Sequence, residues 1–165
     1  MLGLQSTATP LASQSFHQLR LSLCSQHSLE VINLTDQANH WLGEIQARNG
    51  LLILYNLHTS SALAINEAES LLTDDLLDHL RSQAKAGRTY RHDNLSRRVG
   101  VPADEPRNAH SHLMAIGLHN HELVPVIEGQ LVLGTYQALL FLELDGPRQR
   151  SLQLCFQGEC APVDA

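Results

Sequence analysis

Alternating hydrophobic and polar positions mark the first patterned part of the chain. Residues 19–25 (LRLSLCS) alternate in the way that a half-buried strand does. Residues 29–34 (LEVINL) follow after a short polar break, so the two segments can pair as a hairpin. Residues 51–57 (LLILYNL) are continuously apolar, which is typical of a central strand covered on both faces. Residues 61–65 (SALAI) continue this strand or form the next one.

Three other segments carry apolar residues at helical spacing. Thr35 can cap the first helix, which Asn49–Gly50 ends; Thr73 can cap the second, which Gly87 ends; and Asn108 can cap the third. Two aspartates follow Thr73 in the first helical turn, where the helix dipole favours acids. The apolar residues of the three helices are Ala38, Trp41, Leu42 and Ile45; then Leu76, Leu77 and Leu80; then Leu113 and Ile116.

The C-terminal third is rich in strand patterns. We predict strands at residues 123–127, 130–144 and 151–156, separated by turn sequences, and a long surface loop at residues 93–107. Strands before, between and after three helices predict a single α+β domain with a mostly antiparallel, sandwich-like sheet. Its expected bounds are a flexible lead-in at residues 1–18, the domain at 19–158 and a tail at 159–165.

Composition narrows the function classes. The chain has 165 residues, 43% of them hydrophobic and 17% charged, which fits one globular domain. A formal net charge of -6 gives no support to nucleic-acid binding. The three cysteines make no disulfide framework, no apolar stretch is long enough for a membrane span, and the N-terminus is a poor signal peptide. We therefore expect a cytoplasmic protein without membrane or nucleic-acid partners.

Histidine is the distinctive residue, with 10 copies against 11 lysines and arginines together. Three histidines stand at predicted element boundaries: His58 after the central strand, His92 in YRHD and His112 in NAHSHL. Three neutral imidazoles with an open position are a common way to hold a catalytic zinc. A lone histidine at a strand end is, however, more often a hydrogen-bonded structural residue, so the spacing alone leaves both readings open.

A second polar cluster lies in residues 142–150, LELDGPRQR. Glu143 and Asp145 alternate along a strand and so point to one side, and Arg148 and Arg150 can bind phosphate or carboxylate oxygens. The same residues also make an ordinary turn at the end of a strand. Gln137, in LGTYQ, is polar in an apolar run, so it either satisfies a structural neighbour or faces a polar cavity.

Five motifs together resemble one known family. They are, in chain order, HTSSALAINE, YRHD, NAHSHL, LGTYQ and ELDGPRQR, between residues 58 and 150. On these motifs residues 19–158 resemble the YjbQ-like family, also called the secondary thiamine-phosphate synthase family. The resemblance implies an α+β sandwich-like fold, often trimeric, with a polar pocket where the motifs meet.

The resemblance also assigns roles to positions that match the motifs. His58, His92 and His112 would bind a divalent metal, with zinc expected, and Glu67 or Asp145 would act as general base. The positions expected to contact substrate are Thr59, Asn66, Gln137, Glu143 and Arg148. Four departures put substrate identity in doubt: Tyr136 replaces a tryptophan, His110 replaces an acid, Ser60–Ser61 replaces a more usual pair, and the loop after His92 is longer.

Three functions remain open from the sequence. The first is a metal-dependent enzyme acting on a small phosphorylated or anionic metabolite, with weak thiamine-phosphate synthase activity as an implied side reaction. The second is an oligomeric protein, expected to be a trimer, that binds a metabolite or metal without turnover. The third is an interaction protein whose histidines are only structural.

Overall fold

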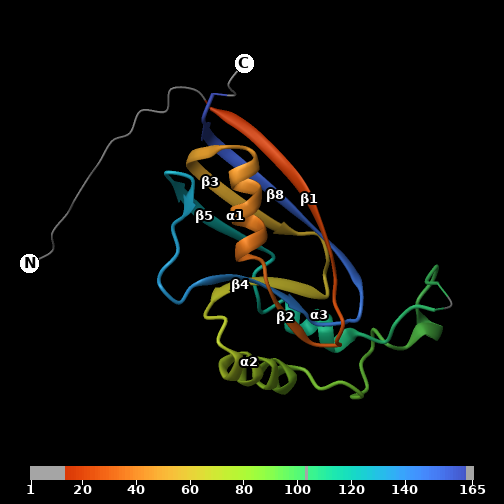
Figure 1. Cartoon of the computed structure of the whole chain (residues 1–165). Coiled ribbons are helices and arrows are strands. Elements are labelled where there is room, and N and C mark those ends of the chain that lie inside the picture. The colour runs from red at the N-terminus through yellow and green to blue at the C-terminus, as the bar shows by residue number, and fades with distance from the viewer. Residues whose placement is uncertain (1–13, 103, 163–165) are drawn as a thin grey trace, which may run out of the picture.

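Two antiparallel sheets and three helices make up the fold (Figure 1). The structure is a computed structural model that describes residues 14–102 and 104–162. The larger sheet has the strand order β1 (Ser15–Cys24), β8 (Gln149–Cys160), β3 (Ala47–Asn56), β5 (His121–Ile127) and β6 (Gln130–Leu131). The smaller sheet has the order β2 (Glu30–Asn33), β7 (Ala138–Glu143) and β4 (Ser61–Asn66). The helices are α1 (Thr35–Glu44), α2 (Ser70–Gln83) and α3 (Ala109–Ala115), with a 3₁₀ turn η1 at Leu95–Arg97.

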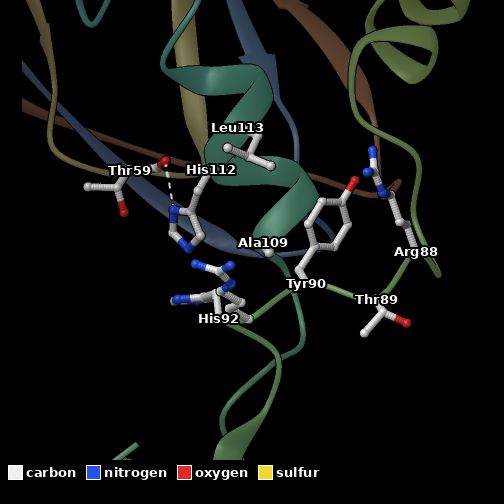
Figure 2. Close-up of a pocket in the computed structure, with 9 residues that line it drawn as sticks. Thr59, Arg88, Thr89, Tyr90, His92, Ala109, His112 and Leu113 are labelled. Atoms are coloured by element: carbon white, nitrogen blue, oxygen red, sulfur yellow. Dashed lines mark hydrogen bonds between the residues drawn. The ribbon is translucent and has the colours of Figure 1, made fainter.

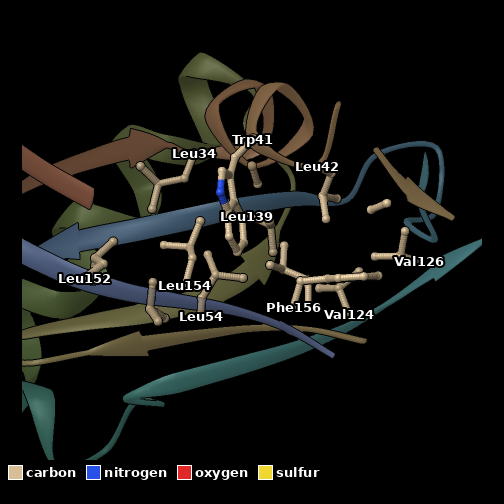
Figure 3. Close-up of a cluster of buried hydrophobic side chains, with 14 of the residues drawn as sticks. Leu34, Trp41, Leu42, Leu54, Val124, Val126, Leu139, Leu152, Leu154 and Phe156 are labelled. Carbon is tan, nitrogen blue, oxygen red and sulfur yellow. The ribbon is translucent and has the colours of Figure 1, made fainter. Parts of the chain in front are cut away.

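The main core lies between the larger sheet on one side and α1 with the smaller sheet on the other. Trp41 and Leu42 of α1 pack with Phe156 of β8, as Figure 3 shows. The alternation along β8 and β3 sends every second side chain to this core, since successive strand residues point to opposite faces.

A second core covers the other face of the smaller sheet. Leu80 of α2 and Met114 of α3 pack there against Leu140 and Leu142 of β7. Leu139 and Phe141, the alternate residues of β7, belong to the main core. All six residues of β7 are therefore buried, and β7 is the strand covered on both faces.

The predicted α+β class, antiparallel sheets, three helices and single domain are confirmed. The expectation that residues 51–57 are covered on both faces is wrong. Leu52 and Leu54 are buried, but Leu51 and Tyr55 are 40% and 45% exposed on the outer face of the larger sheet. A continuous apolar run in the sequence can therefore form a strand that exposes one face to solvent.

The predicted hairpin of residues 19–25 and 29–34 is also wrong. β1 pairs with β8 in the larger sheet, whereas β2 pairs with β7 in the smaller one. The predicted strand 130–144 is divided into β6 and β7, which lie in different sheets. Ordered structure reaches past the predicted domain bounds, because β1 begins at Ser15 and β8 ends at Cys160. The first 13 residues of the predicted lead-in lie outside the described residues.

The helix ends differ from the predicted ones for identifiable reasons. Thr35 is no cap, because its hydroxyl accepts a hydrogen bond from the Leu139 backbone N–H at 2.9 Å. Gly50 does not end α1; it lies in β3 opposite Gly158, where an added Cβ would be 2.8 Å from the Gly158 Cα. α2 begins before Thr73, because Glu69 accepts hydrogen bonds from two backbone N–H groups of its first turn. It also ends before Gly87, at Gln83.

Candidate functional site

Asn56 shapes the loop that joins β3 to β4. Its side-chain amide donates hydrogen bonds to the backbone oxygens of His58 and Ser61, at 3.0 and 2.8 Å. Its side-chain oxygen accepts from the His58 N–H and from the Ser61 hydroxyl. Asn56 is only 3% exposed, so this buried amide replaces the hydrogen bonds that the loop backbone loses on leaving the sheet. The polar residues after the apolar run are thus held in one conformation.

A buried ion pair between Glu143 and Arg150 also holds this loop through a hydrogen bond to Ser60. The Arg150 Nε donates to a Glu143 carboxylate oxygen at 2.8 Å, and a second guanidinium nitrogen donates to the Ser60 hydroxyl at 3.1 Å. Glu143 also accepts from the Ser25 hydroxyl and from the Asp145 backbone N–H. Burial alone would raise the pKa of Glu143, but these hydrogen bonds outweigh it and hold the pKa below its usual 4.5.

His58 is fixed at its ring. Its Nε2 accepts a hydrogen bond from the Ser151 backbone N–H at 2.9 Å. A backbone N–H can only donate, so the proton of the neutral ring is on Nδ1. Burial is the largest cause that lowers the pKa of His58 from its usual 6.5, and the nearby Arg150 charge lowers it further. His58 is therefore a neutral imidazole at physiological pH, with Nδ1–H as the one donor of its ring.

His112 has the opposite arrangement. Its Nδ1 lies 3.0 Å from the Thr59 backbone oxygen, which can only accept, so Nδ1 carries the proton. The Nε2 lone pair of the neutral ring is then directed elsewhere. The His92 ring lies beside it, with ring centroids 5.1 Å apart and planes at 74°. The His92 Nε2 is buried and has no hydrogen-bond partner among the described residues.

These two imidazoles line a pocket of about 770 Å³ between α3 and the segment that joins α2 to α3. Figure 2 shows His112 and Leu113 projecting from α3 on one side, and Tyr90 and His92 from the joining segment on the other. Two guanidiniums also belong to the lining. We call this space the arginine pocket; its residues are Thr59, Arg88, Thr89, Tyr90, Arg91, His92, Ala109, His112 and Leu113.

A smaller pocket of about 460 Å³ adjoins the arginine pocket and shares Thr59 and His112 with it. We call it the neutral pocket, because no lysine, arginine or acid lines it. Its residues are His58, Thr59, Ser61, His112, Ala115, Ile116, Leu118 and Asn120.

Six of the predicted site residues lie in neither pocket, and Asn66, Glu67 and Gln137 are the first three of them. Asn66 is exposed at the end of β4, and its side chain accepts from the backbone N–H of its neighbour Glu67. Gln137 closes a local turn by accepting from the Gly134 N–H at 2.8 Å. The structure brings none of these three side chains to the histidines.

Asp145 and Arg148 pair with each other instead. The Arg148 Nε donates to an Asp145 carboxylate oxygen at 3.0 Å, and Asn108 donates to the same oxygen at 2.6 Å. Asp145 lines a separate pocket of about 380 Å³ that also includes His110. Glu143, as described above, is fully buried in its pair with Arg150. Its contacts are those of a structural group.

The residues fit a divalent metal only in part. His92 and His112 each offer a ring nitrogen, and the Thr59 carbonyl orients His112 as an outer partner orients a metal ligand. His58 does not fit, because its Nε2 is occupied and its Nδ1 is protonated. Within residues 14–102 and 104–162, no group of three or more His, Cys, Asp or Glu side chains is arranged to hold an ion. Metal binding by His92 and His112 stays a prediction.

Sequence reasoning missed the arginine pocket's guanidiniums and the anchors of the loop. Arg91 stands inside the YRHD motif and Arg88 just before it, so a basic cluster around His92 was the available signal. Asn56, directly before the polar stretch, gave no signal, because its role depends on the turn of the chain after β3. The sequence pattern predicts only anion binding for Arg150, whereas the structure pairs it with Glu143.

Together the two antiparallel sheets and three helices define an α+β domain, with a pocket between α3 and the segment that joins α2 to α3. The family model described as "UPF0047 protein YjbQ-like" matches residues 19–159. The chain therefore belongs to the UPF0047, or YjbQ-like, family, as its motifs predicted.

Several relatives match this chain over nearly their whole length. The UPF0047 protein of Archaeoglobus fulgidus is 39% identical over 132 residues, which are 80% of this chain and 94% of that protein. The crystal structure of hypothetical protein APE1520 from Aeropyrum pernix has a TM-score of 0.77 at 35% identity, covering 87% of this chain and 99% of that one. The crystal structure of a YbjQ-like protein of unknown function from Sulfolobus solfataricus has a TM-score of 0.79 at 30% identity, covering 89% of this chain and 100% of that one.

Proposed function

We propose that this protein binds a small phosphorylated metabolite in the arginine pocket and acts on it as an enzyme. One observation carries the proposal: two guanidiniums and two imidazoles line one pocket. Arg88 and Arg91 supply the planar donors that suit phosphate oxygens.

The rest of the lining favours a ligand with more than a phosphate. Tyr90, Ala109 and Leu113 give the pocket apolar walls, and the Arg88 guanidinium lies 6.0 Å from the centre of the Tyr90 ring. Pockets with apolar walls and a few polar groups are the usual form of metabolite sites. A phosphorylated compound with an aromatic or apolar part therefore suits the pocket better than free phosphate.

Catalysis is assigned to His92 and His112. A neutral imidazole can accept or donate a proton near pH 7, and both rings face the same space. Zinc bound by these rings remains part of the proposal, and it would supply a Lewis acid for a phosphate oxygen. Glu67 and Asp145, the bases suggested by the sequence, are not among the lining residues of the arginine pocket, so we give the proton-transfer role to the histidines.

The reaction itself is a further part of the proposal. Weak thiamine-phosphate synthase activity, which the family resemblance implies, needs a site for phosphorylated heterocycles, and guanidiniums beside apolar walls suit them. Incubation with the phosphorylated thiazole alcohol and the pyrimidine pyrophosphate tests it directly. Formation of thiamine phosphate that His92→Asn abolishes would support catalysis. Binding of both compounds without product would instead support the alternative, a non-catalytic metabolite-binding protein.

Phosphate binding is the first experiment. We expect the double variant Arg88→Gln/Arg91→Gln to bind inorganic phosphate at least about 10-fold more weakly by calorimetry, because charge-assisted hydrogen bonds are lost. Arg48→Gln/Arg97→Gln is the matched control, since it removes the same charge from residues outside the pocket lining. Equal weakening in both variants would mean that only net charge matters, and the proposal would fail.

We also propose that the chain assembles with copies of itself, as a trimer, in the cytoplasm. The outer face of the larger sheet exposes large apolar side chains, which is typical of a subunit interface. They are Phe16, Leu51, Tyr55, Leu123 and Ile127. Light scattering should give three times the chain mass, and Leu51→Asp/Leu123→Asp should reduce it to one chain mass.

All three cysteines are free, which fits the reducing compartment that a cytoplasmic location implies. Among the described residues, no helix has the length and apolar character to cross a bilayer.

A further inference from the structure

The neutral pocket differs from its neighbour in charge. The arginine pocket contains two guanidiniums, whereas the neutral pocket has no lysine, arginine or acidic side chain in its lining. The two spaces share Thr59 and His112, so a single ligand larger than phosphate can extend from one into the other. A charged group in the neutral pocket would lose its hydration without gaining an ionic partner there.

His58 gives the neutral pocket a defined hydrogen-bond donor. Because the Ser151 N–H donates to Nε2, the ring cannot offer a lone pair to a ligand, and it can offer only the Nδ1 proton. The backbone hydrogen bond also fixes the ring plane, so the donor is oriented before any ligand arrives. Such a donor suits a hydroxyl, ether or carbonyl oxygen of a ligand and does not suit a cation.

Apolar side chains form one part of the lining of this pocket. Three of its residues, Ala115, Ile116 and Leu118, lie at and just after the end of α3, and Ile116 is 85% exposed. A ligand part that lies there gains apolar contact along one side and one hydrogen bond from His58.

We infer that the neutral pocket binds the uncharged part of the same ligand whose phosphate lies in the arginine pocket, and that His58 is the specificity residue that donates to it through Nδ1. The inference rests on the proposed function and narrows it. The ligand is a phosphomonoester with an uncharged, hydrogen-bond-accepting body, not a molecule with a second anionic end. It also assigns His58 to ligand recognition and not to metal binding.

Matched pairs of phosphate compounds test this inference by calorimetry. Glucose 6-phosphate and glycerol 3-phosphate have uncharged bodies; 6-phosphogluconate and 3-phosphoglycerate resemble them but end in a carboxylate. We expect at least one uncharged-bodied compound to bind about 3- to 10-fold more tightly than inorganic phosphate, the gain of one hydrogen bond. Its carboxylate counterpart should lose that advantage.

Two variants alter the neutral pocket in different ways. His58→Leu removes the donor, and Ile116→Trp fills the pocket from its exposed rim without changing any hydrogen bond described above. Both should remove the extra affinity and leave the affinity for inorganic phosphate unchanged. Because His58→Leu also leaves the Ser151 N–H unpaired, Ile116→Trp keeps the test valid should the first variant fold poorly.

The outcomes separate the two proposals. If inorganic phosphate binds through Arg88 and Arg91 but no uncharged-bodied compound binds more tightly, or if the advantage persists in Ile116→Trp, this inference is overturned and the proposed function stands. If inorganic phosphate does not bind to the wild-type protein, the proposed function fails, and this inference fails with it. Zinc binding that is lost in His58→Leu but kept in His92→Asn would also overturn the assignment of His58.

Discussion

The two walls of the candidate site are held in very different ways. The loop at residues 58–61 is fixed by Asn56 and by the Glu143–Arg150 pair, all three of them buried. Residues 85–92, on the other side, belong to no helix or strand. In the part of the chain that the structure describes, their hydrogen bonds stay within residues 85–94, such as Tyr90 Oη to the Lys85 backbone oxygen.

We call the loop at residues 58–61 the fixed wall. In our proposal this loop positions the histidine rings, whereas residues 85–92 recognise the ligand. The fixed wall holds His58 and the Thr59 carbonyl, which determine the ring orientations of the histidines on that side. The other wall carries the arginines and Tyr90, which contact the ligand in our proposal. A segment with few hydrogen bonds to the rest of the fold can adapt to ligands at little cost in stability. Substitutions in the two walls should therefore affect different measurements.

The largest expected effect is on the buried ion pair. Glu143→Gln leaves the Arg150 charge buried without its counter-ion, and we expect the free energy of unfolding to fall by about 3–5 kcal/mol. Urea denaturation measures it. The double variant Glu143→Leu/Arg150→Leu is the control, because removing both charges should cost less than removing one. A loss below about 1 kcal/mol in Glu143→Gln would contradict the role given to the pair.

Asn56→Ala should have the next largest effect on stability. It leaves several hydrogen-bonding groups of the 58–61 loop without partners, so we expect a loss of about 1–3 kcal/mol. Thr89→Ala, on the opposite wall, is the matched control and should change the free energy of unfolding by less than about 0.5 kcal/mol. Similar losses in the two variants would remove the distinction between the walls.

Much of the fold could be predicted, because alternation in β1 and helical spacing in α1 follow directly from burial on one side. β3 and β7 were harder. Both contain a continuous apolar run, at residues 51–55 and 138–142, yet β3 has an exposed face and β7 has none, and this depends on which layers the chain adds later. The predicted helix cap was wrong where a tertiary contact uses the capping group, because the Thr35 hydroxyl accepts its hydrogen bond from the Leu139 N–H of β7.

The site was predictable in its histidines and not in its charges. His92 and His112 do lie together, and their motifs were visible in the sequence. Asp145 and Arg148 were suitable residue types, but three positions apart they pair with each other. Arg88 was missed because its place beside α3 follows from the path of a segment without regular structure, which carries no periodic pattern.

Acidification should weaken the fixed wall first. The folded-state pKa of His58 is lowered, so its contribution to stability is present above pH 6.5 and is lost as the pH falls towards the folded pKa. The lowered pKa of Glu143 acts in the same direction, with its contribution present above pH 4.5 and lost below. Urea unfolding of the wild-type protein and of His58→Gln, from pH 8 to pH 4, should show a shallower decline below pH 6.5 in the variant. Parallel curves would contradict the assignment for His58.

The smallest expected effect on stability is that of Tyr90→Ala. The side chain is half-buried and its hydroxyl bonds only within its own segment, so the free energy of unfolding should change by less than about 0.5 kcal/mol. Selectivity should change instead, since the apolar wall of the arginine pocket is reduced. Calorimetry with glucose 6-phosphate and pyridoxine 5′-phosphate should show a preference for the aromatic compound that the variant lacks. A stability loss with unchanged selectivity would place Tyr90 with the fixed wall.

A crystal structure with tungstate tests the central claim most directly, because this anion resembles phosphate and its heavy atom is located by anomalous scattering. We expect one strong peak in the arginine pocket, within hydrogen-bond reach of the Arg88 or Arg91 guanidinium. A peak beside Arg148, with none between α3 and residues 88–92, would contradict the account.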